Sequence, residues 1–332
     1  LDEWIACQKG WMYLEPIFGS EDIMRQLPSE ARRFTNVDQL WRKTLAETFA
    51  DPNFMTQSDP EKRLEEKFKS ANQKLDEITK GLNDYLEIKR LYFPRFFFLS
   101  NDELLEILSQ TKDPKAVQPH LGKCFEGINK VEFEQDAKIK SIISAEGEQV
   151  PLDTKVDPET PANKGNVEKW LLELESIQWF SIRTQTEGSL AEYIRIDRKD
   201  WILNWPAQVI LGVSCVFWTK EVTKALDAGG GAALEECLGT LNQQLKDMVI
   251  LVRGGLKKLQ RKTLGALTTI DVHNRDVVAK MVKIGTCETV DFEWMSQLRY
   301  YWAEAWKGGQ AAKEGEPTMV ARIVNAKCLY GY

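Results

Sequence analysis

Apolar residues recur at helical spacing along most of this chain. The clearest pattern is a heptad seam in which apolar residues alternate at spacings of four and three. It comprises Leu64, Phe68, Ala71, Leu75, Ile78, Leu82 and Tyr85. The run Ser58-Asp59-Pro60-Glu61 predicts a capping box before it, and Phe93-Pro94 predicts that the helix stops near Leu91. Because the seam is too short for a free coiled coil, we expect it to pack on other helices of the chain.

The same periodicity predicts further helices, separated by Pro and Gly. Pro16 is expected to break the first of these helices and Pro119 the fifth, whereas Gly254-Gly255 is expected only to kink the long helix that contains it. The helix that follows Pro206 is apolar nearly all round, so it should be central. The predicted helices cover residues 1–14, 21–27, 30–49, 104–110, 116–125, 166–177, 207–226, 232–267, 273–283 and 292–306.

Aromatic residues cluster directly after the seam. We interpret this cluster as buried packing between helices, and a Phe box that holds a cofactor is the alternative. Ser100-Asn101-Asp102-Glu103 predicts a second capping box just beyond it. The cluster consists of Phe93, Phe96, Phe97, Phe98 and Leu99.

Residues 131–152 change to a period of two. Val131 and Phe133 alternate with Glu132 and Glu134, which predicts two or three short antiparallel strands. A polar connector follows, and residues 319–332 are expected to form a strand. The predicted fold class is therefore mostly α, an elongated rod of antiparallel helical bundles with one small antiparallel β insertion.

Composition and charge narrow the function classes. Of the 332 residues, 43% are hydrophobic, which supports a real core, and the net charge of −6 argues against a general nucleic-acid binder. No run reaches the roughly 18 apolar residues that span a bilayer, so no membrane partner is predicted. The chain starts at Leu1 without Met or a signal peptide, so we expect it to be a piece of a longer protein. Six singly spaced cysteines suggest reduced thiols.

Motifs for catalysis are missing from the sequence. Gly229-Gly230-Gly231 is not followed by Gly-Lys-Ser/Thr, as a phosphate-binding Walker A loop requires. His120 and His273 are the two histidines, and we interpret both as structural. Acid pairs such as Glu146 and Glu148 are expected to be solvated. We therefore predict no catalytic, cofactor-binding or metal-binding residue in this chain.

One basic cluster has three interpretations. It is a solvated helix face, a surface for an acidic protein partner, or, least favoured by the net charge, a nucleic-acid site. The cluster consists of Arg253, Lys257, Lys258, Arg261 and Lys262.

The run from Asp84 to Gln110, which ends the seam and includes the aromatic cluster, strongly resembles the linker region of dynein heavy chains. Other matching segments follow the family order over almost the whole chain, and residues 176–193 depart most from it. Their character is axonemal rather than cytoplasmic. The segments are Gln26-Leu27-Pro28-Ser29-Glu30, Asp113-Pro114, Val117-Gln118-Pro119-His120-Leu121, Gly165-Asn166-Val167-Glu168-Lys169-Trp170-Leu171, Trp205-Pro206-Ala207-Gln208-Val209 and residues 321–332.

The resemblance implies a mechanical function. In dyneins the linker is a helical lever that bends and straightens over the AAA+ ring during ATP hydrolysis, and the motor moves toward microtubule minus ends. The resemblance implies that this chain is not an enzyme by itself and holds no cofactor, with ATP and Mg bound in the ring of the parent chain. It implies as partners that ring, intermediate and light chains of the complex, and microtubules through the parent stalk. The expected location is the cytoplasm and cytoskeleton, in the axoneme of a cilium or flagellum.

The resemblance also suggests how the chain is divided. We expect an N-terminal helical part of the linker (1–130), a β insertion and connector (131–165), a C-terminal helical part (166–318) and a junction toward the first AAA+ module (319–332). A hinge is expected between Pro94 and Gly127, with a rigid aromatic corner as the alternative there. The β insertion and the 308–317 loop are expected to face partners. The alternative function is a static helical scaffold or protein-interaction module without a motor role.

Overall fold

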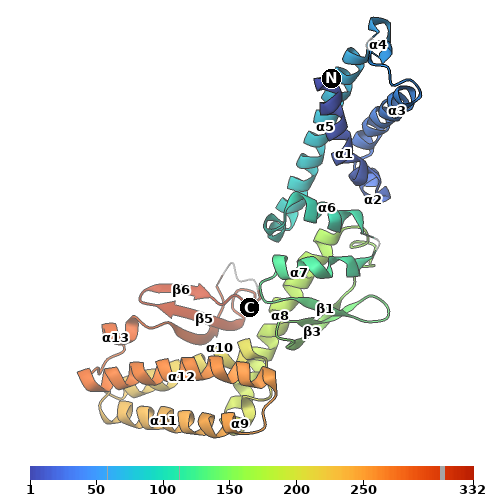
Figure 1. The fold of residues 1–332 in the computed structure, drawn as a ribbon. Helices are drawn as coiled ribbons and strands as arrows, with labels where there is room; N and C mark the ends of the chain where they lie inside the picture. Colours follow the sequence, from blue (N-terminus) through green and yellow to red (C-terminus); the bar gives the residue numbers. More distant parts are fainter. Residues whose placement is uncertain (58, 112, 307–310) are drawn as a thin grey trace. The chain divides into compact units, whose positions relative to one another are not determined.

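The computed structural model describes residues 1–57, 59–111, 113–306 and 311–332 (Figure 1). Its fold is mostly helical, as predicted, with two small three-stranded sheets in the orders β1-β2-β3 and β4-β5-β6. Two compact units are present. The first contains residues 1–138 and 157–172, and the second contains residues 139–156 and 173–332.

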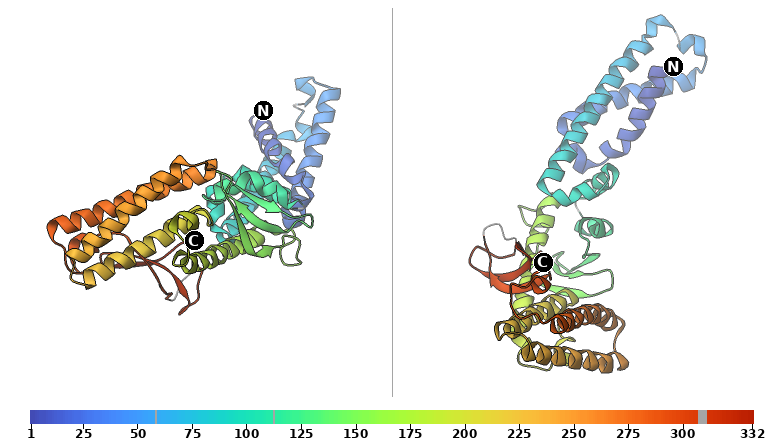
Figure 2. Two further views of the ribbon diagram at one scale, coloured as in Figure 1. Left: turned by 90° about the horizontal axis from the view of Figure 1, so that it is seen from below. Right: turned by 90° about the vertical axis from the view of Figure 1, so that its left-hand side faces the viewer.

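The first unit is built around the predicted seam helix. This helix, α5 (Leu64–Tyr92), packs against α1 (Asp2–Phe18) and α3 (Pro28–Ala50), as the right-hand view of Figure 2 shows. Two short helices, α2 (Glu21–Gln26) and α4 (Phe54–Gln57), flank α3 in the chain. The predicted burial is confirmed for Phe68, Ala71, Leu75, Ile78 and Leu82, whereas Leu64 and Tyr85, at the two ends of the seam, are half-buried.

Aromatic rings fill the middle of this three-helix bundle. Trp4 of α1 lies 4.9 Å from Phe68 of α5 between ring centroids, and Trp11 lies 5.8 Å from Trp41 of α3. The Trp11 indole N–H donates a hydrogen bond of 2.8 Å to Asp38 of α3, so its polar atom is satisfied between α1 and α3. Because each large aromatic ring buries a large area, a few such residues are enough to hold the three helices together.

The start of α5 and the end of α1 differ from the predictions. Ser58, the expected cap, lies outside the described residues, and a short 3₁₀ turn, η1 (Pro60–Lys62), precedes α5. The Asp59 carboxylate caps this turn by accepting a hydrogen bond of 3.0 Å from Glu61 N–H. Helix α1 is not broken at Pro16 but continues to Phe18. One proline removes one backbone hydrogen bond, and burial of Leu14 and Phe18 maintains the last turn.

The rest of the first unit consists of short elements. They are η2 (Pro94–Phe98), α6 (Asn101–Ser109), η3 (Pro114–Val117), α7 (Gln118–Cys124), β1 (Lys130–Phe133) and the start of α8 (Val167–Tyr193). Pro119 lies in the first turn of α7, so it starts this helix rather than breaking it.

The second unit is centred on α10 (Ala207–Asp227), as its apolar sequence predicted. Helices α11 (Ala232–Arg253) and α12 (Lys258–Ile284) pack on it, and α9 (Arg198–Trp201) contacts α11. The shared core contains Trp218, Val222, Ala225, Leu226, Leu234, Cys237, Leu241, Val278, Met281 and Trp294.

Gly254-Gly255 ends a helix, so the predicted kink is wrong. Helices α11 and α12 lie side by side in Figure 1, joined by residues 254–257. Gly254 is fully extended, with φ −78° and ψ 180°, which no helix interior adopts. Two hairpin helices bury two apolar stripes against each other, whereas one long helix would leave its second half without a partner.

The β insertion is confirmed, and one of its residues forms a hydrogen bond with the start of α10. Strands β2 (Ile139–Ile143) and β3 (Gln149–Val156) pair antiparallel, with Ile142 opposite Val150. The expectation that Glu148 is solvated is wrong: it is half-buried and accepts a hydrogen bond of 2.9 Å from Ala207 N–H. A carboxylate there satisfies a free N–H at the start of α10.

A second sheet replaces the helix predicted over residues 292–306. Only α13 (Phe292–Met295) is helical there, followed by β4 (Arg299–Glu304), β5 (Pro317–Ile323) and β6 (Ala326–Leu329). The strand expected after residue 319 is therefore confirmed as β5 and β6. Strand β4 pairs antiparallel with β5 and packs on α10. Residues 307–310, in and next to the 308–317 loop expected to face partners, lie outside the described residues.

We expect Leu75→Ala to lower the free energy of unfolding by about 2–5 kcal/mol, because the side chain is only 3% exposed in the seam. Leu91→Ala is the matched control on the same helix, where the side chain is 67% exposed, and it should change the value by less than about 0.5 kcal/mol. Urea unfolding of both variants measures the difference. Equal, small effects would contradict the packing of the seam.

Candidate functional site

Residues 94–127 are the candidate site, because the short elements there predict a hinge. Among the described residues, no group of three or more His, Cys, Asp or Glu side chains is placed to hold a metal ion. Nor is any described helix long and apolar enough to cross a membrane.

The aromatic cluster divides into a buried and an exposed half. Phe93 and Phe96 are fully buried and meet edge to face at 5.0 Å, and Phe93 also contacts Phe125 at 6.0 Å. Phe97 and Phe98 are 58% and 71% exposed, so the prediction that the whole cluster is buried is wrong for these two. The turn is 3₁₀, with three residues per turn, and consecutive side chains in it cannot all face one core.

Two arginines brace the turn through backbone carbonyls. Arg90 of α5 donates hydrogen bonds to the carbonyls of Phe96 at 3.4 Å and Leu99 at 3.1 Å. Arg95 donates one of 3.2 Å to the carbonyl of Cys124, and its guanidinium lies over the Phe125 ring. The last carbonyls of a short helical turn have few backbone partners, and charged donors satisfy them strongly. The Phe96 carbonyl also accepts a hydrogen bond of 3.1 Å from Leu99 N–H.

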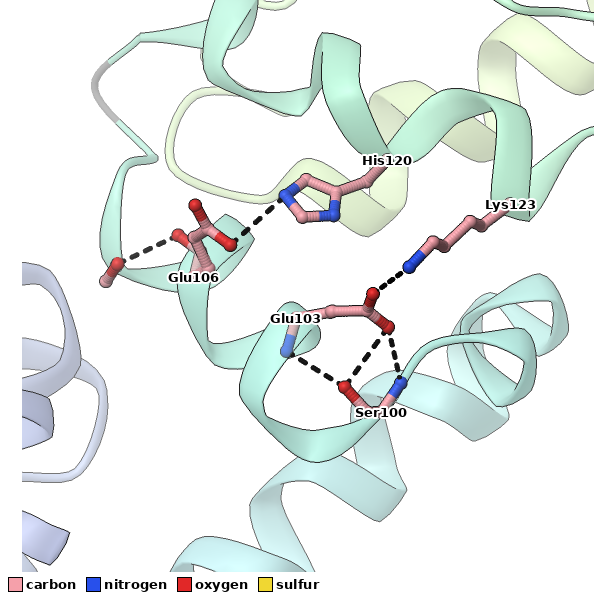
Figure 3. A network of polar contacts seen from close by, with 6 residues as sticks. Ser100, Glu103, Glu106, His120 and Lys123 are labelled. Carbon is pink, nitrogen blue, oxygen red and sulfur yellow. Dashed lines mark hydrogen bonds and ion pairs between the residues drawn. The ribbon is translucent and has the colours of Figure 1, made fainter.

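Figure 3 shows a polar network that joins α6 to α7. The predicted capping box is confirmed: Ser100 and Glu103 bond each other's backbone N–H groups. The same Glu103 carboxylate also pairs with Lys123 of α7. The Lys123 ammonium, followed by the Ser100 N–H, lowers the pKa of Glu103 to about 2. One carboxylate therefore caps one helix and ties it to the next.

His120 also lies in this network, as a structural residue. The side chain is buried, and its Nε2 atom lies 3.5 Å from a carboxylate oxygen of Glu106. At the far end of α6, Thr111 donates a hydrogen bond of 2.9 Å to Asp22 of α2. Helix α6 is thus held at both ends.

Sequence reasoning missed a buried ion pair that connects α5 to α8. The Lys89 ammonium lies 2.5 Å from Glu168, and both side chains are almost completely buried. Lys89 also lies over the ring of Tyr85, which bonds Gln26 of α2. The partners are far apart in the sequence, and no local pattern indicates such a pair.

A second missed pair lies in the second unit. Arg198 of α9 forms two parallel hydrogen bonds of 2.9 Å with the two oxygens of Asp271 on α12. This fork geometry is the strongest arrangement between arginine and a carboxylate. Both pairs join helices that local sequence does not connect.

The basic cluster divides between structure and surface. Arg261 donates hydrogen bonds of 3.1 Å to the carbonyls of Val252 and Gly254, so it closes the α11–α12 turn. Lys262 lies 3.7 Å from Glu146, which is therefore also paired. The other three members, Arg253, Lys257 and Lys258, have no carboxylate within 4.0 Å among the described residues.

Comparison with known proteins gives the relatives of this chain. A family model described as "Dynein heavy chain, N-terminal region 2" matches residues 1–189. Over the whole chain, the sequence is 48% identical to mouse (Mus musculus) dynein axonemal heavy chain 3, 49% to mouse dynein axonemal heavy chain 12 and 44% to mouse dynein axonemal heavy chain 1. The chain spans 8%, 10% and 7% of the length of these proteins, respectively.

We expect Glu103→Gln to flatten the acid dependence of stability of the first unit. Because folding lowers the pKa of Glu103 to about 2, its contribution is fully present above the ordinary value of 4.5 and is lost as the pH falls toward 2. Urea unfolding between those pH values measures the slope. Glu236→Gln, at an exposed residue of α11, should keep the original slope. Identical slopes for Glu103→Gln and the unmodified chain would contradict the role of this carboxylate.

Proposed function

This chain belongs to the dynein heavy chain family, and from this premise we propose that it is the linker of an axonemal motor subunit. The observation that carries the proposal is the similarity to axonemal heavy chains, which extends over the whole chain. In this proposal the chain is a mechanical element that changes shape over the ATP-hydrolysing ring of the same heavy chain. The site of action is the axoneme of a cilium or flagellum, and microtubules, intermediate chains and light chains are partners of the parent complex.

The packing of the first unit supports the role of a lever. A lever must resist bending along its stiff part, because a flexible rod would dissipate the stroke. Helix α5 has 29 residues, and its seam is buried on α1 and α3 along most of that length. Bending it would break backbone hydrogen bonds and open a close-packed aromatic core at once.

The contacts of residues 94–127 favour a rigid corner there. A bend in this segment would separate Phe93 from Phe125, Arg95 from Cys124 or Glu103 from Lys123. These contacts join residues that are about 20 to 30 positions apart, so they brace the segment as a block. The short elements of this segment predict a hinge, which stays a prediction. The lever that we propose has a stiff corner here instead.

We expect fluorescent labels on Lys67 and on the ring of the parent motor to change their separation with nucleotide state. Energy transfer in the presence of ATP, ADP and ADP-vanadate measures it, after Cys287 and Cys328, the two exposed thiols, are replaced by Ser. A constant separation in a motor that still moves microtubules would contradict the lever and support a static scaffold.

A second pair of labels tests the corner itself. Lys67 and Lys130 are exposed and lie on either side of residues 94–127, so their separation should stay constant in all nucleotide states. Lys67 and Lys80, both on α5, provide the control for a rigid element. A nucleotide-dependent change in the first pair but not in the second would place the hinge in this segment.

The isolated chain should show no response to ATP and Mg²⁺. A ligand that binds only the folded state raises the free energy of unfolding by RT ln(1 + L/Kd), where L is the free ligand concentration. Nucleotide sites outside this chain therefore predict an unchanged melting temperature. Differential scanning fluorimetry with about 1 mM ATP-Mg measures this, and the parent motor should respond in the same assay. A reproducible shift of several degrees in the isolated chain would contradict the assignment of nucleotide binding to the ring.

A further inference from the structure

The turn between α11 and α12 carries an exposed surface that is both apolar and basic. Val249 and Ile250 are 50% and 69% exposed on the solvent side of α11. Lys246 and Arg253 lie on the same side of the helix, at spacings of three, four and seven along it. Lys257 and Lys258 follow directly after the turn. We call these six residues the tip surface.

The apolar residues of the tip surface have no role in folding that the structure shows. The opposite side of α11 already supplies the core through Leu234, Cys237, Leu241 and Met248. Val and Ile are also poor helix formers, because branching at Cβ restricts their rotamers against the preceding turn. At an exposed helical position, folding therefore gains little from either side chain.

Two lysines of the tip surface, Lys257 and Lys258, are placed against the electrostatics of α12. Helix α12 starts at Lys258, and its first turn contains no acidic residue. Cations are unfavourable at a helix N-terminus, where the backbone N–H groups carry partial positive charge. In the same chain, α1, α2, α3, α5, α6, α8 and α11 each have an acidic residue in the first turn, whereas α4, α7 and α10 have none.

The tip surface is preorganised by its neighbours. Arg261 fixes the turn by donating hydrogen bonds to Val252 and Gly254, and Lys257 N–H donates one of 3.0 Å to Gln260. Within the described part of the chain, no carboxylate lies within 4.0 Å of Lys246, Arg253, Lys257 or Lys258. The tip surface thus combines four cations with two exposed apolar side chains, on a chain whose net charge is −6.

From these observations we propose that the tip surface binds an acidic amphipathic segment of a protein. The carboxylates of that segment pair with the four cations, and its apolar side chains cover Val249 and Ile250. Complementary charge steers such a partner to the tip surface, and burial of Val249 and Ile250 supplies the affinity. A phosphate backbone would satisfy the cations but leave Val249 and Ile250 uncovered. The inference does not depend on the lever proposed above.

A labelled synthetic peptide tests this proposal on the 332-residue chain. The probe is a helical peptide of about 18 residues with Leu along one face and Glu beside it, and the comparison peptide has the same composition in scrambled order. We expect saturable binding of the probe, measured by fluorescence anisotropy, and at least about tenfold weaker binding of the scrambled peptide. Raising NaCl from about 0.05 M to about 0.5 M should weaken binding of the probe strongly.

Variants distinguish specific binding from general attraction. Lys257→Glu with Lys258→Glu, and separately Ile250→Ser, should each weaken binding of the probe about tenfold. The matched control is Lys283→Glu with Ile284→Ser, at the opposite end of α12, where Ile284 is 52% exposed. It should change binding less than about twofold.

Thermal unfolding shows whether a variant loses binding because it has lost stability. The Lys257→Glu, Lys258→Glu variant should melt at the same or a higher temperature than the unmodified chain, because acidic residues suit the start of α12. Reduced binding together with unreduced stability therefore supports the proposal. Equal binding of both peptides, an equal loss in the Lys283→Glu, Ile284→Ser control, or binding to phosphatidylserine vesicles without binding to the probe would overturn it.

Discussion

The first unit depends on the apolar seam of α5. A helix with an apolar stripe must bury it against other helices, and α1 and α3 supply the two surfaces that close around it. Trp4, Trp41 and Phe68 meet where these three helices come together, so a change at one ring alters the packing of all three. Arg90 and Phe93, at the end of this helix, hold the short elements that follow it, because both contact Phe96.

Buried ion pairs make a different contribution from the seam. Replacing a buried pair by apolar residues often leaves stability unchanged, whereas removal of one partner leaves an uncompensated charge. The two buried pairs therefore fix the relative position of their helices more than they raise the free energy of unfolding. They are Lys89 with Glu168 and Arg198 with Asp271. Each pair accepts one relative position of its two helices, and slippage by one turn would bury both charges unpaired. Such specificity suits a protein whose proposed role is to keep its shape under load.

The two ends of the α11–α12 hairpin differ in how well their residues suit the helices. Toward Ile284, α12 ends in the expected way, with Gly285 in the left-handed conformation at φ +77°. At the other end, Lys257 and Lys258 at the start of α12 and the β-branched Val249 and Ile250 on α11 oppose helix preference. Local conflicts of this kind concentrate where a surface serves a partner rather than the fold.

Local features were predictable from the sequence because their causes are local. The seam of α5, the capping box at Ser100 and the alternation of the β insertion each depend on residues within a few positions of one another. The linker resemblance was readable for the same reason, since its motifs are contiguous. That this chain has no catalytic residue stays a prediction, because it depends only on the motifs that the sequence lacks.

Tertiary structure decided everything that depends on partners distant in the chain. Trp294, Leu298, Tyr301 and Trp302 fit a helical period, yet β4 forms because Arg299–Glu304 pairs with Pro317–Ile323 on α10, and aromatic residues suit a strand as well as a helix. Gly254-Gly255 separates two helices because α12 gains more by packing on α11 than by extending it. Spacing cannot reveal that Glu168 meets Lys89 or that Phe98 faces solvent, because both depend on which surfaces the folded chain has already covered.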